Sequence, residues 1–293
     1  MQRNHFLLML HLTKGIGSAA EAKIIAAITH DQAPKRYPWS VYALCQILQI
    51  NPNSKQAQNI TYAYQQQLNQ KTFPIDVDYI TYFDEAYPIQ LREIFEPPLI
   101  LFYQGHLAAL KLPNLAIVGT RTATNYGYQA LQHLLPDVVH SGTAVISGLA
   151  KGIDTMAHQI TLRRGGVPIA VIGTGIDQFY PASNRQLQSQ IARSGLVLSE
   201  YAPGCGPYRS HFPARNRIIA GLSSVTLVVE AKIKSGSLIT ANSALQNNRE
   251  VLTIPGPIFA ENSQGTNELL ALGAKPVVKS KDILESIQIF DSI

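Results

Sequence analysis

Five turn segments along one stretch of the chain constrain its fold more than any other feature. They are IVGTRTATNYG at 117–127, ISGLAKGIDTMAH at 146–158, IGTGIDQFYPASN at 172–184, FPARNRII at 212–219 and VEAKIKSGSLITA at 229–241. Four of them follow a short run of β-branched or aliphatic residues, and most lead into an amphipathic segment. We therefore expect a parallel α/β sheet whose turns present backbone N–H groups to an anionic ligand at the carboxyl ends of the strands.

Strand and helix patterns alternate along the same stretch. Strand patterns occur at 115–119, 143–147, 167–172, 196–199, 225–230, 250–254 and 276–278. Helical patterns lie between them at 126–140, 154–164, 184–194, 215–221, 237–247 and 266–273. This alternation predicts right-handed βαβ crossovers. The preceding segment, from about residue 73, reads as extended pieces around a helix at 87–95, and we expect it to extend the main sheet.

Residues 1–72 differ from the rest, because their apolar positions recur at helical spacing between Gly and Pro breaks. We expect a small all-helical domain at 1–72, followed by the sheet domain at 73–288. Within the helical domain, TKGIG at 13–17 has two interpretations. It is similar to the hairpin of a helix-hairpin-helix module that touches DNA phosphates, or it is a helix–helix turn that needs glycine for its backbone angles.

Composition sets the class of protein. The chain has 293 residues, of which 46% are hydrophobic, and its 24 Lys and Arg outnumber 19 Asp and Glu. This mild excess is compatible with a phosphate-rich partner. The two cysteines, Cys45 and Cys205, suggest neither a disulfide framework nor a zinc site. No apolar run is long enough to span a membrane, so we expect a cytoplasmic protein without a membrane partner.

Arginines and lysines gather at the turns. Arg121, Lys151, Arg209, Arg215 and Arg217 all lie in or beside them. No carboxylate pair, Cys/His cluster or nucleophile triad accompanies these cations. The pattern therefore indicates a binding protein with no catalytic residue, no cofactor and no metal.

The segment GPYRSHFPARNRII carries most of the nucleic-acid signal. Arg209, Arg215 and Arg217 can contact phosphates, while Tyr208 and Phe212 offer rings on which an unstacked base could lie. Arginines interleaved with aromatic residues favour single strands over duplex. The alternative is that Phe212 packs beneath the loop and the arginines are solvated or paired with Glu200 and Glu230.

Other chemistries are less well supported. The first turn lacks G-x-G-x-x-G, and no acidic residue ends the strand at 143–147 to hold a ribose, which argues against NAD. Asp154 and His158 lie four residues apart on one helical face, as a metal pair or acid/base couple could. Helix capping and a buried hydrogen bond are the simpler roles for them. Ser237 lacks the G-x-S-x-G context of a nucleophile, and Ser235 or Ser237 is expected to cap the helix that begins there.

Taken in order, the motifs resemble the DprA/Smf family of DNA-processing proteins over roughly 75–285. The matching motifs are GTR with a later YG, SGLAxGID with a following AH, GxGxDxxYPxxN, FPxRNRxIA, SGSLxTAxxA with a following PG, and GTNxLLxxGA. The resemblance implies an extended Rossmann-like domain that binds single-stranded DNA, forms a homodimer and loads the recombinase RecA during natural transformation. The expected DNA-binding residues are Gly119, Thr120, Arg121, Ser147, Gly148, Lys151, Arg209, Phe212, Arg215, Asn216, Arg217, Ser235, Gly236 and Ser237.

The same architecture is also similar to that of phosphoribohydrolases, which cleave N-glycosidic bonds, and this is the alternative function. Their P-G-G-x-G-T-x-x-E motif is missing here, although Glu230 ends a strand.

The resemblance also implies an interface for the dimer and for RecA. It is expected near Leu269 and Leu270, in a helical segment that also contains Leu272. Three leucines supply more apolar surface than one helix face needs, and Leu270 is expected to be the exposed one.

Overall fold

The computed structural model describes residues 1–70 and 76–291, and these divide into two compact units. One unit comprises residues 1–87 and 95–102, and the other comprises residues 88–94 and the chain from residue 103 onward. The expected boundary between residues 72 and 73 lies outside the described residues. Besides its helices, the first unit contains residues 76–87 and 95–102, which the sequence pattern assigned to the sheet domain.

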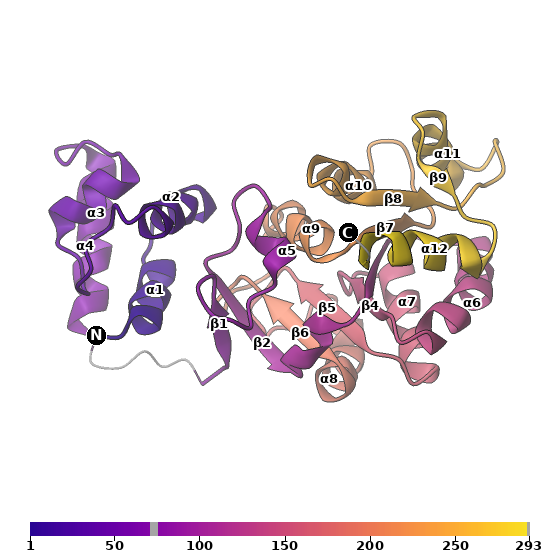
Figure 1. Cartoon of the computed structure of the whole chain (residues 1–293), viewed down its shortest axis with the longest axis horizontal. Coiled ribbons are helices and arrows are strands. Elements are labelled where there is room, and N and C mark those ends of the chain that lie inside the picture. The colour runs from indigo at the N-terminus through magenta and orange to yellow at the C-terminus, as the bar shows by residue number, and fades with distance from the viewer. Residues whose placement is uncertain (71–75, 292–293) are drawn as a thin grey trace. The chain divides into compact units, whose positions relative to one another are not determined.

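The first unit is built on four helices. They are α1 (Arg3–Leu12), α2 (Ser18–Thr29), α3 (Val41–Leu48) and α4 (Lys55–Asn69) (Figure 1). Phe6 of α1 lies edge-on to Trp39, with ring centroids 4.9 Å apart, and both side chains are buried. The Tyr64 hydroxyl of α4 donates to the Trp39 carbonyl at 2.8 Å. An aromatic core therefore joins the helices that the apolar periodicity predicted.

The TKGIG segment forms the turn between α1 and α2. Gly15 has a φ of +97°, a backbone conformation that glycine adopts without strain. At the start of α2, the Ser18 hydroxyl donates to Glu96 at 2.7 Å, so a carboxylate of this unit already lies at the helix N-terminus. This arrangement favours the helix–helix turn over the phosphate-binding hairpin.

Within the described residues, nine strands form one mostly parallel sheet with the order β1-β2-β6-β5-β4-β3-β7-β8-β9. Their bounds are β1 (Tyr79–Thr81), β2 (Ile100–Gly105), β3 (Asn114–Val118), β4 (Ala144–Ser147), β5 (Pro168–Ile172), β6 (Leu196–Ser199), β7 (Val225–Val228), β8 (Glu250–Thr253) and β9 (Lys275–Pro276). β1 pairs with β2 antiparallel, and the pairs along β6-β5-β4-β3-β7-β8-β9 are parallel. The predicted parallel α/β sheet and its extension by the segment after residue 76 are confirmed.

Helices connect the strands of the second unit. They are α5 (Ile89–Arg92), α6 (Asn125–His140), α7 (Ile153–Arg163), α8 (Arg185–Ser194), α9 (His211–Leu222), α10 (Gly236–Gln246), α11 (Gln264–Ala271) and α12 (Ser280–Asp291), with short 3-10 turns η1 (Leu107–Lys111), η2 (Ala182–Asn184) and η3 (Glu261–Ser263). α7 packs against α6 and α8, and α6 also packs against α12. α9 packs against α5 and α10 (Figure 1).

Two helices differ from expectation. α5 is a single turn instead of the helix predicted at 87–95, which Pro88 and Pro97 bracket closely. α9 begins at His211, four residues before the predicted start, with Pro213 in its first turn, where its missing N–H costs no helical hydrogen bond. Phe212 therefore lies on a helix and not in a flexible loop.

The order of the strands identifies where a ligand would bind. From β3 the chain moves outward through β4, β5 and β6, then crosses back to place β7 on the other side of β3. A ligand in an open α/β sheet binds outside the carboxyl ends of the strands at such a reversal. The loops after β3 and β7 therefore lie where a ligand of this sheet would bind.

Among the helices formed by residues 1–70 and 76–291, none is both long enough and apolar enough to cross a bilayer.

Candidate nucleic-acid interface

An open cavity of about 820 Å³ lies at the reversal point of the sheet. It is bounded by the loop after β3, the first turns of α9 and the loop that runs from β7 into α10. The predicted residues that line it are Gly119, Thr120, Arg121, Arg209, Phe212, Arg215, Asn216, Ser235, Gly236 and Ser237. Residues from three distant parts of the sequence thus meet where the topology places a ligand.

Backbone hydrogen bonds join the loop after β3 to the loop after β7 and to the start of α7. The Thr120 N–H donates to the Glu230 carbonyl at 2.7 Å, which continues the β3–β7 ladder past the strand ends. The Ile153 N–H at the start of α7 donates to the Thr120 carbonyl at 3.2 Å. Gly152 makes this approach possible: its φ is +77°, and a Cβ there would lie 2.3 Å from the Thr120 carbonyl oxygen. The turns after β3 and before α7 are therefore held in place by backbone hydrogen bonds.

Glu230 is buried two residues after the end of β7 and supports a helix. Its carboxylate accepts the Thr124 N–H at 2.9 Å and the Thr124 hydroxyl at 2.6 Å, and Thr124 is the N-cap of α6. A carboxylate at this end of a helix interacts favourably with the helix dipole. Gly127 is needed beside it, because a Cβ would lie 2.4 Å from Glu230 Oε2. Glu230 is thus engaged in holding α6, which leaves it poorly placed as the acid of a hydrolase.

Asp154 organises the loop between β4 and α7. Its Oδ2 accepts the N–H groups of Gly148 at 3.1 Å and Ala150 at 3.3 Å. Burial raises the pKa of this carboxyl group, while nearby Arg215 and the two backbone donors oppose that shift. These donors precede α7, whose N-terminus has no side-chain cap, so Asp154 makes the expected buried hydrogen bonds but does not cap the helix.

Arg215 is buried, with 4% of its surface exposed, although it was expected to contact phosphate from a loop. Its Nη1 donates to the carbonyls of Gly148 and Val171, so one guanidinium joins α9 to the ends of β4 and β5. A Cβ at Gly148 would lie 2.5 Å from Nη2, which explains the glycine. Burial lowers the pKa of Arg215 to about 10, so the side chain remains charged at neutral pH. Arg215 supports the cavity floor and adds its charge there.

An aromatic group forms one wall of the cavity. The Arg121 guanidinium lies over the Phe212 ring, 5.6 Å from its centroid. The Tyr180 ring packs against Phe212 with centroids 5.1 Å apart. A cation and two rings therefore line one wall, an arrangement suited to stacking on an unpaired base.

The remaining cations of the lining are more exposed. Arg209 and Lys234 face solvent, and Lys232 is half-buried and pairs with Glu261 at 2.7 Å. The hydroxyls of Ser235 and Ser237, which also line the cavity, lie 2.8 Å apart at the start of α10. Neither side chain accepts a capping hydrogen bond from the helix, contrary to the cap expected there. The N-terminal N–H groups of α10 are thus not satisfied by a side-chain cap, and Gly236 and Ser237 of this first turn line the cavity.

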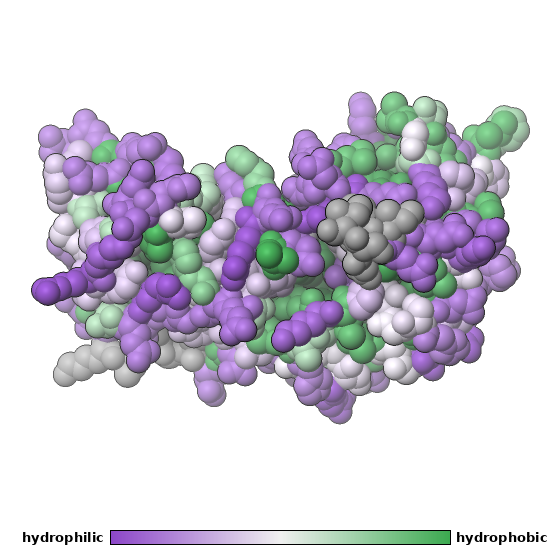
Figure 2. All heavy atoms as spheres, viewed as in Figure 1, coloured by the Kyte–Doolittle hydropathy of each residue, from purple (hydrophilic) through white to green (hydrophobic). Residues whose placement is uncertain are grey.

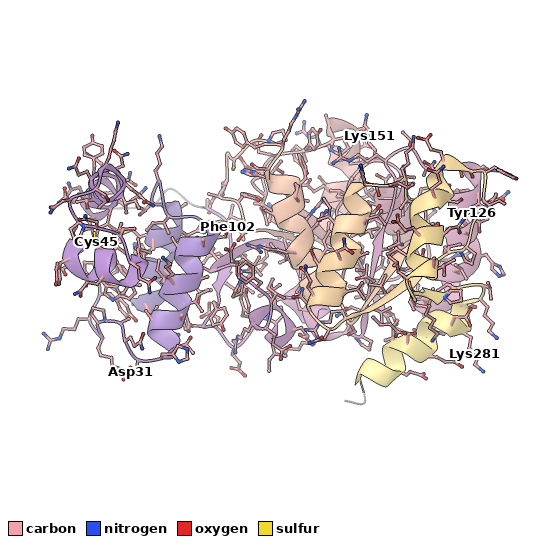
Figure 3. The ribbon with its side chains drawn as sticks, turned by 90° about the horizontal axis from the view of Figure 1, so that it is seen from above. Asp31, Cys45, Phe102, Tyr126, Lys151 and Lys281 are labelled. Atoms are coloured by element: carbon pink, nitrogen blue, oxygen red, sulfur yellow. The ribbon has the colours of Figure 1, made fainter. Side chains whose placement is uncertain are left out.

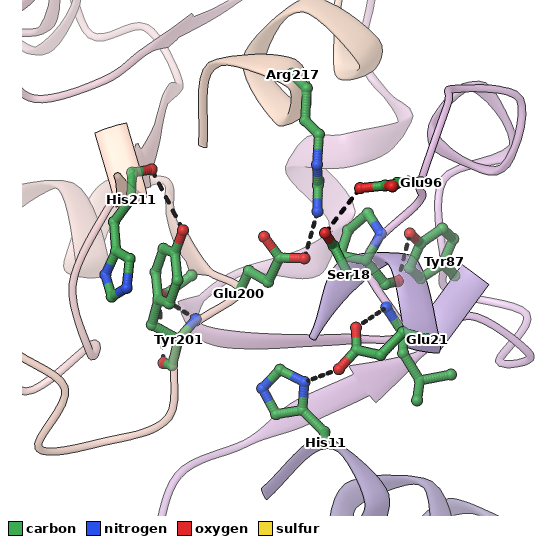
Figure 4. A network of polar contacts seen from close by, with 12 residues as sticks. His11, Ser18, Glu21, Tyr87, Glu96, Glu200, Tyr201, His211 and Arg217 are labelled. Carbon is green, nitrogen blue, oxygen red and sulfur yellow. Dashed lines mark hydrogen bonds and ion pairs between the residues drawn. The ribbon is translucent and has the colours of Figure 1, made fainter. Parts of the chain in front are cut away.

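Several predicted residues lie outside the cavity lining. Ser147 is fully buried and donates to the Ile117 carbonyl at 2.6 Å. Arg217 pairs with Glu200 at 2.5 Å, as the alternative interpretation allowed (Figure 4). Gly148 packs under Arg215, and Lys151 is exposed in the turn before α7 (Figure 3). Tyr208, considered as a stacking ring, lies edge-on to His211 with centroids 5.1 Å apart.

Sequence reasoning missed part of the site. Tyr180, Ile233, Ile239, Lys232 and Lys234 line the cavity without having been named. The basic KIK segment and the aromatic FY pair were visible in two of the five turns. Their burial and direction depend on the loop conformations, which the pattern of residue types does not specify.

His158 is fully buried on α7, and its imidazole lies beside the backbone of Ser147. Burial lowers the pKa of its imidazole to about 3, so the ring is neutral at neutral pH. Within residues 1–70 and 76–291, no group of three or more His, Cys, Asp or Glu side chains could hold a metal ion. His158 thus has the environment of a core residue.

The prediction that Leu270 is the exposed leucine near the C-terminus is wrong. Leu269 is buried, Leu270 is half-buried, and Leu272 is 80% exposed. α11 ends at Ala271, and Leu272 is its C-cap residue, followed by Gly273 with a φ of +101°. The chain therefore turns away from the core at Leu272, and Leu272, not Leu270, is the exposed leucine.

Comparison with known proteins agrees with these motifs. A family model described as DNA recombination-mediator protein A matches residues 78–288. The chain belongs to this family. Over 205 residues it is 47% identical to the DNA processing protein DprA of Streptococcus pneumoniae, covering 70% of this chain and 72% of that protein. The resemblance drawn from the motifs is thus confirmed.

Solved structures of the family agree with the fold. The X-ray structure of DprA from Streptococcus pneumoniae superposes with a TM-score of 0.86 and 36% identity, covering 97% of this chain and 98% of that one. DNA processing protein A from Helicobacter pylori superposes with a TM-score of 0.65 and 30% identity, covering 73% and 97%. The latter structure is described for its unique single-stranded DNA binding mode. The first of these similarities extends to nearly the whole chain, including its N-terminal helices.

Proposed function

We propose that this protein binds single-stranded DNA in the cavity between the β3 and β7 loops. The observation that carries the proposal is the composition of the lining, where Arg121, Arg209, Lys232 and Lys234 line the same cavity as Phe212 and Arg121 lies over its ring. Cations and stacking rings recognise phosphates and unpaired bases without reading base-pair edges. The single-stranded DNA binding described for the Helicobacter pylori relative supports the same conclusion.

The protein acts as a binder and not as a hydrolase. The buried carboxylates nearest the cavity, Asp154 and Glu230, accept hydrogen bonds from backbone N–H groups of neighbouring loops. A catalytic acid or base needs its carboxyl group within reach of the reacting atoms. Incubating the protein with nucleoside monophosphates should therefore release no base, whereas release above a protein-free control would restore the phosphoribohydrolase alternative.

The biological role follows from family membership. We infer that the protein holds incoming single strands during natural transformation and recombination in the cytoplasm. We further infer that it forms a homodimer and loads the RecA recombinase. The membership supports the recombination role, and the exposed Leu272 beyond α11 offers an apolar contact for a dimer.

Fluorescence anisotropy with labelled oligothymidine and a blunt duplex of equal length tests the central claim. We expect tighter binding to the single strand and affinity that falls as salt rises, because phosphate contacts release counterions. Measurements at matched ionic strength are required. Equal or tighter binding to the duplex would overturn the proposal.

A further inference from the structure

A second group of side chains lies beside the cavity, in the loop between β5 and α8. This loop supplies Tyr180 to the cavity and carries Phe179 and Arg185 next to it. We propose that a bound strand leaves the cavity over Tyr180 and continues along Phe179, Arg185 and Lys151, which we call the outer rim. This inference rests on the proposed function and adds a second binding segment to it.

Tyr180 is the first step of this path. Its side chain is 43% exposed, while its ring packs on Phe212 at a centroid distance of 5.1 Å and an interplanar angle of 37°. A base stacked on Phe212 would therefore have Tyr180 as its neighbouring aromatic surface. Successive bases of a single strand bind successive rings in this way.

Phe179 and Arg185 form the next step. The Arg185 guanidinium lies 4.9 Å from the centroid of the Phe179 ring, and Arg185 is exposed at the first residue of α8. The ring holds the guanidinium in place while its N–H groups remain open to a phosphate. This pair repeats the combination of Arg121 and Phe212 within the cavity.

Asn184 fastens the outer rim to the next loop. Its amide donates to the Leu149 carbonyl at 2.9 Å and to the Thr155 hydroxyl at 2.7 Å, and the side chain is buried. These bonds hold the end of the β5–α8 loop against the β4–α7 loop, in which Lys151 is exposed (Figure 3). Lys151, which does not line the cavity, therefore lies on the same fixed rim as Arg185.

The two cations also share a position in the fold. Arg185 begins α8, and Lys151 lies two residues before α7 begins. Both helices start at the carboxyl ends of strands, which is the edge of the sheet that carries the cavity. The phosphates of a strand that continues past the cavity along this edge would meet positive side chains at the starts of α7 and α8.

The test compares oligothymidines of increasing length on the full chain by fluorescence anisotropy. Lys151→Gln/Arg185→Gln should leave the affinity for the shortest bound oligomers unchanged and weaken long oligomers about tenfold, because only long strands reach the rim. Two lost phosphate contacts should flatten the salt slope of the long oligomer by about 1.4. The length at which affinity stops rising should become shorter.

The matched control is Arg163→Gln/Arg193→Gln, which removes the same charge from exposed positions at the opposite ends of α7 and α8. It should bind every length like the parent. Tyr180→Ala should weaken short and long oligomers, and Tyr180→Phe should restore binding because the ring is retained.

The outcomes separate the two proposals. A parent protein that binds no single strand overturns the proposed function and the outer rim together. A parent that binds, with a Lys151/Arg185 variant that matches the Arg163/Arg193 control at every length, overturns the outer rim alone. Equal weakening of short and long oligomers would also overturn it, because the two cations would then act within the cavity.

Discussion

The charged residues beneath the cavity and those facing its solvent side differ in what they do. Arg215, Asp154 and Glu230 are buried, and each accepts or donates hydrogen bonds that tie one loop to another. Arg121 and Arg209 line the same cavity but are exposed. A single set of motifs therefore supplies both the scaffold of the site and the charge on its solvent side.

The contrast appears within nine residues of the chain. Arg209 is exposed at the cavity, Arg215 is buried under it, and Arg217 pairs with Glu200 (Figure 4). An exposed arginine contributes little to folding, whereas a buried one leaves unpaired groups when it is removed. Substituting Arg215 should therefore lower the stability of the fold, whereas substituting Arg209 should lower the affinity for DNA.

The largest effect is expected for Arg215→Ala. The variant leaves two buried carbonyls without their donor and Asp154 without a neighbouring cation, which should lower the free energy of unfolding by about 3 kcal/mol. Denaturant unfolding measures this loss. The comparison between buried and exposed arginines would break if Arg209→Ala destabilised the protein equally, or if Arg215→Ala melted like the parent.

A second prediction concerns His158, which is fully buried and does not line the cavity. The pKa of His158 is lowered to about 3 in the fold, against about 6.5 in an unfolded chain. Above pH 6.5 the ring is neutral in both states. As pH falls below 6.5 only the unfolded state gains a proton, so stability falls by about 2 kcal/mol between pH 7 and pH 5.

Unfolding of the parent and of His158→Gln at several pH values isolates this contribution. The variant should lose less stability on acidification than the parent, because it has no imidazole to protonate. Identical pH profiles for the two proteins would show that His158 is accessible to protons in the fold.

On the exposed side, Arg121→Ala and Arg209→Glu should each weaken single-strand binding at least about tenfold, equivalent to about 1.4 kcal/mol. Each lost phosphate contact should flatten the salt slope by about 0.7. Thermal melting should stay unchanged, because both side chains are exposed. Parent-like binding by both variants with unchanged melts would place these arginines outside the DNA site.

The sequence predicted the sheet because strand and helix periodicities are local properties. Strands such as 144–147 and 196–199 fell within a residue of their predicted bounds. The extent of α9 was less predictable, since Pro213 is compatible with a first helical turn as well as with a loop. Because α9 begins at His211, it carries Phe212, whose ring packs against Tyr180, a residue more than thirty positions away in the sequence.

The sequence predicted which residue types form the candidate site, but not which of these side chains are buried. Arg215 and Arg121 look alike in sequence, and only the fold shows that the first donates to Val171 beneath the cavity. Burial is a long-range property of α9 against β4 and β5, so residue type and spacing do not reveal it. For the same reason the residue pattern favours Leu270 although Leu272 is the exposed leucine, because the exposed position depends on where α11 ends.

The smallest effect is expected at the far end of the sheet, where the proposed homodimer would form. Figure 2 shows apolar atoms gathered around α11, and Leu272 is 80% exposed there while Leu269 is buried. Leu272→Arg should therefore convert a dimer to a folded monomer, whereas Leu269→Arg should destabilise the fold itself. Because each cavity stays intact, the Leu272 variant should lose DNA affinity only through lost avidity, with short oligomers bound as by the parent. Light scattering and anisotropy on the same samples measure both properties. A Leu272→Arg protein that remains a dimer and binds long strands like the parent would move the interface away from α11.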